Sequence, residues 1–95
     1  MNDKQKMIVA VLREYGCSTT ADIARLVNKR FAQILTPASI SGTIRAYVTR
    51  GLMASADNGN NKKVYWITDF GKEYFKWAEL EIFLKLKLVK YSLYI

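Results

Sequence analysis

The side chains that can do chemistry in this sequence are concentrated between residues 36 and 63, and they are mostly hydroxyls and cations. Serine, threonine and arginine recur over residues 39–50, and two adjacent lysines follow a stretch rich in Asn and Gly. No Asp or Glu occurs between residues 36 and 55. Such side chains donate hydrogen bonds to phosphate oxygens and to the edges of bases. The pattern therefore indicates a surface for a polyanion.

The same inventory argues against catalysis. The chain contains no histidine and one cysteine, Cys17, so a histidine-based triad or a zinc site cannot be built. The carboxylates are few and scattered, and no glycine-rich phosphate loop occurs. We expect a protein that is not an enzyme and that carries no cofactor and no metal.

Composition sets the scale and the class of the protein. Ninety-five residues, half of them apolar, make one domain with a single modest core. Fifteen Lys and Arg against eight Asp and Glu give a formal charge of +7, which favours an anionic partner. There is no apolar run of the roughly 20 residues that a membrane span needs, and we expect no secretory signal in the first residues, whose short apolar stretch is interrupted by charges. With a single cysteine, these features favour a reducing, cytoplasmic location.

The polar residues over 39–50 belong to a predicted helix. Thr36 is placed to cap it, Pro37 suits its first position, and Gly51 ends it. The helical repeat turns Ile40, Ile44, Tyr47 and Val48 inward. The opposite face then carries Ala38, Gly42, Arg45, Ala46 and Thr49, flanked by Ser39, Ser41, Thr43 and Arg50.

Two helices are predicted before this one and a hairpin after it. The first begins near residue 2 or 3, ends at Gly16 and has a buried stripe of Met7, Ile8, Val11, Leu12 and Tyr15. The second begins among residues 18–20 and buries Ile23, Leu26 and Val27. The connection over residues 29–35 is longer than that of the tightest helix-turn-helix units, so either the second helix runs on or the turn is expanded. Strands at 52–56 and 64–68 flank a turn at 57–61, where Asn and Gly predominate.

Three stretches of the chain resemble the winged helix-turn-helix superfamily of bacterial and phage transcription regulators. They are TADIARLVN (residues 20–28), TPASISGTIRAYVTRGLM (36–53) and VYWITDFGKEYF (64–75). The last is similar to the Tyr-x-Leu-Thr-x-x-Gly ending of many such domains, here with Trp66, Ile67, Thr68 and Gly71. The resemblance covers about three fifths of the chain. It implies an α+β, mainly helical fold with three helices, a two-stranded β-wing and an extended C-terminal helix.

The resemblance also implies a function: sequence-specific binding of double-stranded DNA by a transcriptional regulator. Helix 37–50 would enter the major groove, and the 57–63 wing would lie on the backbone. The candidate DNA-binding residues are Ser39, Ser41, Gly42, Thr43, Arg45, Thr49, Arg50, Asn60, Lys62 and Lys63. The plainer interpretation of these residues is that those of the helix form an ordinary solvated face and that Asn60, Lys62 and Lys63 belong to an ordinary hairpin turn. A winged helix that binds other proteins within a larger assembly, without DNA, is the alternative function.

The two ends of the chain are expected to have different roles. Residues 1–77 would form the winged-helix domain, and residues 78–95 a C-terminal extension. As a helix, this extension has two apolar faces, which favours a homodimer over intramolecular packing or a membrane-surface helix. Its last residues, LKLKLVKYSLYI, also alternate with period two, so a terminal strand remains open. The aromatic side chains could form a platform on which bases stack, but we expect them to pack in the core and the hairpin instead; they are Tyr65, Trp66 and Phe70.

Overall fold

Each helix of the computed structural model, which describes residues 1–76, begins at a side chain that caps it. The elements are α1 (Asp3–Tyr15), α2 (Thr20–Phe31), α3 (Pro37–Thr49), β1 (Met53–Asp57), β2 (Lys63–Ile67) and α4 (Asp69–Tyr74). Asn2 and Gln5 form a reciprocal capping box at α1. Thr19, Thr36 and Thr68 each accept an amide N–H three residues on, at 3.2, 3.2 and 3.0 Å. The cap predicted at Thr36 is confirmed, and the first two helices begin where the sequence predicted.

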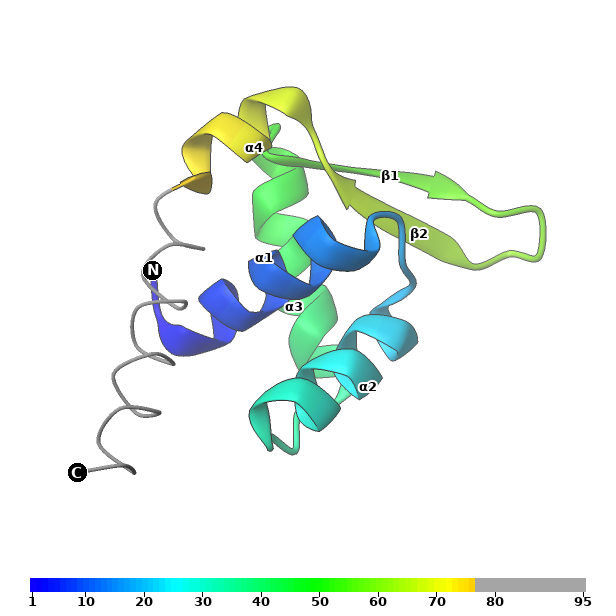
Figure 1. Ribbon diagram of the computed structural model, residues 1–95. Coiled ribbons are helices and arrows are strands. Elements are labelled where there is room, and N and C mark those ends of the chain that lie inside the picture. The colour runs from blue at the N-terminus through cyan, green and yellow to red at the C-terminus, as the bar shows by residue number, and fades with distance from the viewer. Residues whose placement is uncertain (77–95) are drawn as a thin grey trace.

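Helix α1 lies at the centre of the apolar core, with α2 on one side and the hairpin on another (Figure 1). Five consecutive residues of α1, from Ile8 to Leu12, are therefore buried. The predicted single stripe was too narrow, because Val9 and Ala10 are covered as well. It was wrong at Tyr15, whose side chain is 53% exposed beyond the end of the packed region. The core is completed by Ile23, Ala24, Val27, Ile40, Ile44, Tyr47, Leu52, Met53, Ile67 and Phe75.

The long connection between α2 and α3 is held by the side chain of Asn28. Its amide nitrogen donates to the Leu35 carbonyl at 2.9 Å, and its oxygen accepts the Leu35 amide at 2.8 Å. One side chain thus pairs with both backbone groups of Leu35, as a strand neighbour would. Ala32 ends α2 in the left-handed conformation, with φ 53°. The expanded turn is a defined structure that brings Thr36 to the start of α3.

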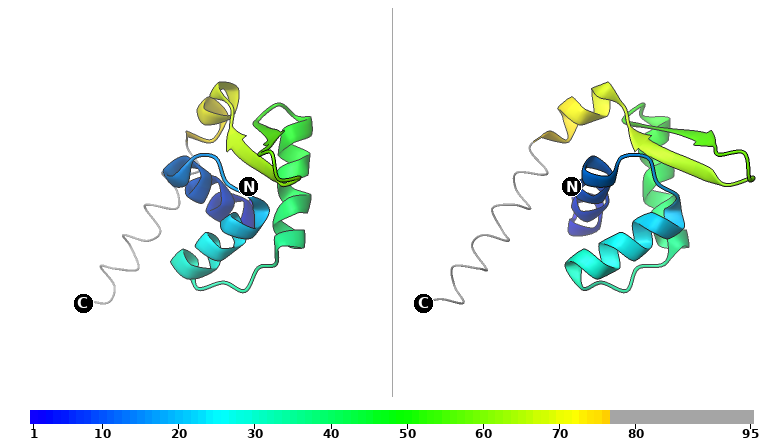
Figure 2. Two further views of the ribbon diagram at one scale, coloured as in Figure 1. Left: turned by 90° about the vertical axis from the view of Figure 1, so that its right-hand side faces the viewer. Right: turned by 45° about the vertical axis from the view of Figure 1, so that its right-hand side comes forward.

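The wing is an antiparallel hairpin whose register runs from Met53 opposite Ile67 to Asp57 opposite Lys63. Its strands begin and end within a residue of the predicted bounds. The tip uses positive φ at Gly59 (89°) and Asn61 (58°), which glycine and asparagine tolerate best. A further antiparallel bridge joins Ser18 to Tyr65, through hydrogen bonds of 3.0 and 2.8 Å. This bridge attaches the base of the wing to the connection between α1 and α2. Figure 2 shows the hairpin projecting beyond the helices.

The expected α+β, mainly helical winged helix-turn-helix fold is confirmed. No helix within residues 1–76 is long and apolar enough to cross a membrane. The predicted C-terminal extension at 78–95, with its helix or strand alternatives, lies outside the described residues.

Candidate nucleic-acid interface

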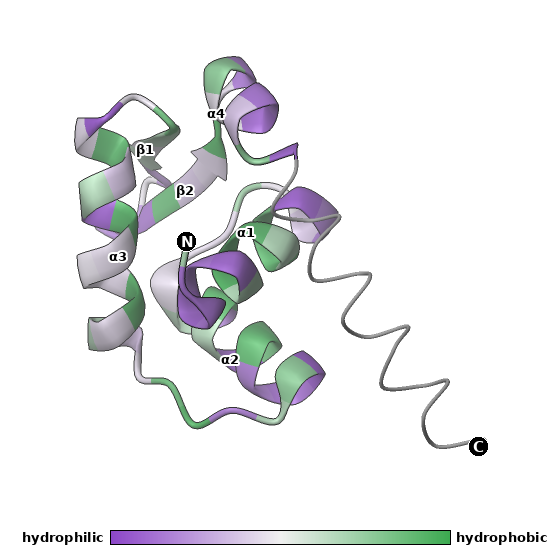
Figure 3. Cartoon of the chain, turned by 90° about the vertical axis from the view of Figure 1, so that its left-hand side faces the viewer, coloured by the Kyte–Doolittle hydropathy of each residue, from purple (hydrophilic) through white to green (hydrophobic). Residues whose placement is uncertain are grey.

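The outer face of α3 has the composition that the helical repeat predicted. Ile40, Ile44 and Tyr47 are buried in the core, whereas Gly42, Arg45 and the other residues of the opposite face are exposed. Ser39, Ser41 and Thr43 lie half-buried along the flanks. Figure 3 shows green apolar stretches alternating with pale and purple polar stretches along α3. The face is thus available to a partner along its whole length.

Backbone is accessible in the middle of this face. A Cβ atom built on Gly42 would meet no other atom within 4 Å, apart from its own helix. Gly42 therefore serves no internal packing, and its neighbours Ala38 and Ala46, one turn away on either side, are small and exposed. Together they make a shallow strip on which another molecule can approach the helix closely. Arg45 stands beside this strip as an exposed cation.

Several hydroxyls on the helix already use their protons. The Oγ1 of Thr43 donates to the Ser39 carbonyl at 3.5 Å, and that of Thr49 to the Arg45 carbonyl at 3.1 Å. These local bonds fix the side-chain rotamers and leave lone pairs that can accept a hydrogen bond from a ligand. The Thr43 and Thr49 side chains are therefore held in place by their own helix.

One cation at this surface is absent from the sequence-based candidates. The Nζ of Lys4, on the first turn of α1, donates to the Ser39 hydroxyl at 3.3 Å. This contact adds a positive charge to the N-terminal end of α3 from a residue 35 positions earlier. No local pattern signals it, because the pairing arises from the way α1 lies beside α3.

Arg50 differs from the other candidates because its guanidinium is engaged within the protein. Its Nη2 donates to the Tyr74 hydroxyl at 2.9 Å, and the group lies 5.1 Å from the Tyr74 ring and 5.9 Å from the Tyr47 ring. Tyr47 in turn meets Phe75 edge to face at 5.0 Å. Arg50 therefore lies at the edge of the α3 surface, directed toward α4.

The wing contributes a second, separate part of the candidate surface. Asn60, Lys62 and Lys63 are exposed at or beside the hairpin tip. The Asn58 side chain accepts the Asn60 amide at 3.1 Å, and the Asn58 amide donates to the Lys62 carbonyl at 2.9 Å, so the tip is an ordered turn. Strand β1 packs beside α3, while the tip extends away from the helices (Figure 2). The two sets of residues thus lie on neighbouring elements.

Charge is distributed unevenly over the described elements. Carboxylates on α1, α2 and α4 form ion pairs: Glu14 with Arg30, Asp22 with Arg25 at 3.5 Å, and Asp69 with Lys72 at 3.8 Å. Helix α3 carries no carboxylate, so the potential of Arg45 is not cancelled on its own helix. Within residues 1–76 no cluster of three metal-ligating side chains occurs.

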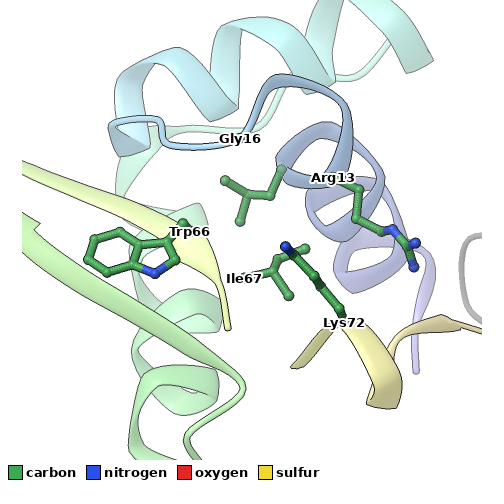
Figure 4. Close-up of a pocket in the computed structure, with 6 residues that line it drawn as sticks. Arg13, Gly16, Trp66, Ile67 and Lys72 are labelled. Atoms are coloured by element: carbon green, nitrogen blue, oxygen red, sulfur yellow. The ribbon is translucent and has the colours of Figure 1, made fainter. Parts of the chain in front are cut away.

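A cavity of about 450 Å³ lies apart from α3, between α1, β2 and α4 (Figure 4). The side chain of Lys72 extends from α4 toward Ile67 on β2. The walls of this cavity combine apolar, aromatic and cationic groups. They are formed by Leu12, Arg13, Gly16, Trp66, Ile67 and Lys72.

Comparison with known proteins shows similarity at the level of structure only. No protein-family profile and no curated protein sequence matches the chain. Among solved structures, the adhesin competence repressor AdcR from Streptococcus pyogenes matches with a TM-score of 0.78 at 17% identity, over 98% of this chain and 66% of that one. F-93 of SSV1 matches with a TM-score of 0.74 at 16% identity, over 93% and 94% of the two chains. ZitR of Lactococcus lactis, solved as a variant in complex with DNA, matches with a TM-score of 0.69 at 20% identity, over 97% and 58%.

These similarities establish the fold. The chain is a winged helix, as are the regulators that it resembles. It spans about two thirds of the length of AdcR and somewhat less of ZitR.

Proposed function

We propose that the protein binds double-stranded DNA sequence-specifically and regulates transcription in the cytoplasm. The observation that carries the proposal is the outer face of α3. It is exposed, open to close approach at Gly42, basic at Arg45 and without carboxylates, on a helix that the fold holds against a single core. The structure of ZitR in complex with DNA supports this use of the fold.

In the proposed complex, α3 enters the major groove, which is about 12 Å wide and admits one α-helix. Arg45 and Ser41 contact base edges, and Gly42 allows the backbone to approach them. The Thr43 and Thr49 hydroxyls accept hydrogen bonds from the DNA or its bound water, because their protons are used within the helix, and the half-buried Ser39 hydroxyl lies beside them. Lys4 extends the contact to a phosphate beside the N-terminal end of α3.

The wing is proposed to contact the DNA backbone. Lys62 and Lys63 bind phosphates, and Asn60 supplies a neutral hydrogen-bond donor. Because the tip is ordered by Asn58 but projects beyond the helices, it can reach a stretch of backbone that α3 does not touch. These contacts contribute affinity with little sequence preference.

We further propose that two copies act together. Residues 1–77 form the DNA-binding domain, and residues 78–95 join two such domains into a homodimer that recognises a two-fold symmetric site. The apolar sequence of 78–95 supports this assignment. Sedimentation equilibrium of the full chain and of a chain ending at Trp77 tests it. We expect the full chain to be a dimer and the truncated chain to be a monomer. The same number of chains per particle in both proteins would refute the assignment.

The mobility of random-sequence duplex DNA, measured across a salt series, tests DNA binding itself. Binding that weakens steeply as salt rises is expected, because phosphate contacts release condensed counterions. Failure to retard DNA even at low salt would sink the proposal. That result would favour a winged helix that binds another protein.

A further inference from the structure

The C-terminal end of α3 and the C-terminal end of α4 are joined by a cluster of contacts that the DNA surface does not require. Tyr74 accepts the hydrogen bond from Arg50 at 2.9 Å, and its ring packs edge to face on Phe75 at 5.2 Å. Phe75 is fully buried and packs on Tyr47 of α3. An arginine at the C-terminal end of α3 is thus held between an aromatic ring of α3 and one of α4.

Two backbone contacts fix the other end of α4. The Oγ1 of Thr68 donates to the Gly51 carbonyl at 2.8 Å while it accepts the Gly71 amide at 3.0 Å. Gly71 lies so close to the Leu52 carbonyl that a Cβ atom would come within 1.9 Å of its oxygen. Helix α4 is therefore held at both ends to the segment that leaves α3.

We propose that Tyr74, through its hold on Arg50, is a positioning residue that fixes the direction of α4 relative to α3. This inference rests on the proposed function, because α4 precedes residues 78–95 in the sequence, and these are the segment proposed to join two copies. The angle between α3 and α4 then sets how far apart the two recognition helices lie, and with it the half-site separation that the dimer accepts.

The contacts of Arg50 support this role over a direct contact with DNA. Its guanidinium donates to the Tyr74 hydroxyl and lies beside two aromatic rings, so its direction is set by contacts within the protein. Small changes in the direction of α4 matter because neighbouring base pairs differ by only about 3.4 Å in position along DNA. Two loosely attached domains would accept several half-site separations, whereas two firmly attached domains accept one.

The first experiment requires no DNA. Spin labels at Ala46→Cys on α3 and Glu73→Cys on α4, in a Cys17→Ser background, report the distribution of distances between the two helices. We expect a narrow distribution that broadens with Tyr74→Ala and, to a smaller extent, with Tyr74→Phe, which keeps the ring but removes the acceptor. Tyr15→Ala, at an exposed tyrosine of α1, is the matched control. A distribution that stays narrow in both Tyr74 variants overturns the proposal.

The second experiment measures the half-site separation. A duplex selected from random DNA by the full-length protein provides the site, and its two halves are then moved apart or together in single base pairs. Tyr74→Ala should flatten the preference for one separation while affinity for an isolated half-site changes less than about twofold, since no DNA contact is lost. A preserved preference, or a loss of about fivefold or more at the isolated half-site, contradicts the positioning role.

The two experiments separate this inference from the proposed function. If the full-length protein selects no DNA, the proposed function fails. The distances between the spin labels still show whether Tyr74 fixes the direction of α4 relative to α3. Thermal unfolding of each variant shows whether the domain remains folded, and Tyr74→Phe carries the test if Tyr74→Ala does not fold.

Discussion

Gly71 lies directly against the carbonyl group of Leu52. A Cβ atom at Gly71 would be 1.9 Å from the Leu52 oxygen and 2.8 Å from its carbon. The same oxygen accepts the Thr68 amide at 3.2 Å, so the first turn of α4 is in contact with the backbone at the start of the wing. This close approach gives a physical reason for a glycine three residues after the capping threonine.

Gly71→Ala is expected to destabilise the domain. The added methyl would meet backbone atoms that cannot move without disturbing both the cap and the wing, and overpacking of this kind costs about 1–3 kcal/mol. Chemical denaturation followed by circular dichroism measures the change. An unchanged free energy of unfolding would show that the segment adapts and that the close approach has no structural importance.

Gly42→Ala should raise stability and lower DNA affinity at the same time. Gly42 lies in the interior of α3 in open space, so alanine gains about 0.5–1 kcal/mol from helix propensity without a clash. The added methyl would stand on the strip proposed to approach the bases. Denaturation measures the expected rise in the free energy of unfolding, and mobility-shift titration of the same preparation measures the expected fall in DNA affinity. Tighter or equal DNA binding would remove Gly42 from the proposed interface.

Arg45→Ala and Lys62→Ala should weaken DNA binding in different ways. Loss of a base contact at Arg45 should cost about 1–3 kcal/mol and change the sequence preference. Loss of a phosphate contact at Lys62 should weaken all sequences alike and reduce the salt slope by about one. Selection from random DNA with each variant distinguishes them, and equal losses that are blind to sequence would exclude base reading by Arg45.

Lys4→Gln should weaken binding to every sequence, with a smaller salt slope, because Lys4 adds a positive charge beside Ser39 at the N-terminal end of α3. Lys72→Gln is the charge-matched control. Lys72 lies on α4, in an ion pair with Asp69 and at the cavity away from α3. Salt-dependent titrations of the two variants compare them, and identical slopes would show that only net charge matters.

Tyr47→Phe should make the protein more resistant to alkali. Burial, and secondarily the nearby Tyr74, raise the pKa of Tyr47 above its ordinary value of 10.0, while Arg50 lowers it. The folded state thus favours the neutral phenol, and its stability falls as pH rises above about 10, where the unfolded chain ionises first. Phenylalanine removes this loss.

At neutral pH the same substitution should be neutral or stabilise by up to about 1 kcal/mol. The Tyr47 hydroxyl is buried without a hydrogen-bond partner among the described residues, and phenylalanine relieves that cost. Unfolding free energies of both proteins at neutral pH and above pH 10 are the measurement. A marked loss at neutral pH would reveal a partner for this hydroxyl.

The sequence alone determined the features that depend on near neighbours. Capping side chains bond to amides three residues away, so Thr36 could be identified as the start of α3, and the starts of α1 and α2 could be placed within two or three residues. The exposed and buried faces of α3 follow from the helical repeat, and the wing tip from the backbone preferences of Asn and Gly. These local rules were enough to predict the helices, the hairpin and the exposed side chains of α3, and the resemblance to the winged helix-turn-helix superfamily indicated how they assemble.

Only the tertiary structure decided which of these parts meet. Lys4 contacts Ser39, Arg50 contacts Tyr74 and Ser18 pairs with Tyr65, although each pair is far apart in sequence. The burial of Val9 and Ala10 likewise required α1 to be covered from more than one side. Such contacts depend on how the elements pack. The type of a residue shows that its side chain can form a contact, but it does not show which distant residue is the partner. The sequence therefore determined what each element is, and packing determined which side chains extend the surface of α3 and how α4 is attached to it.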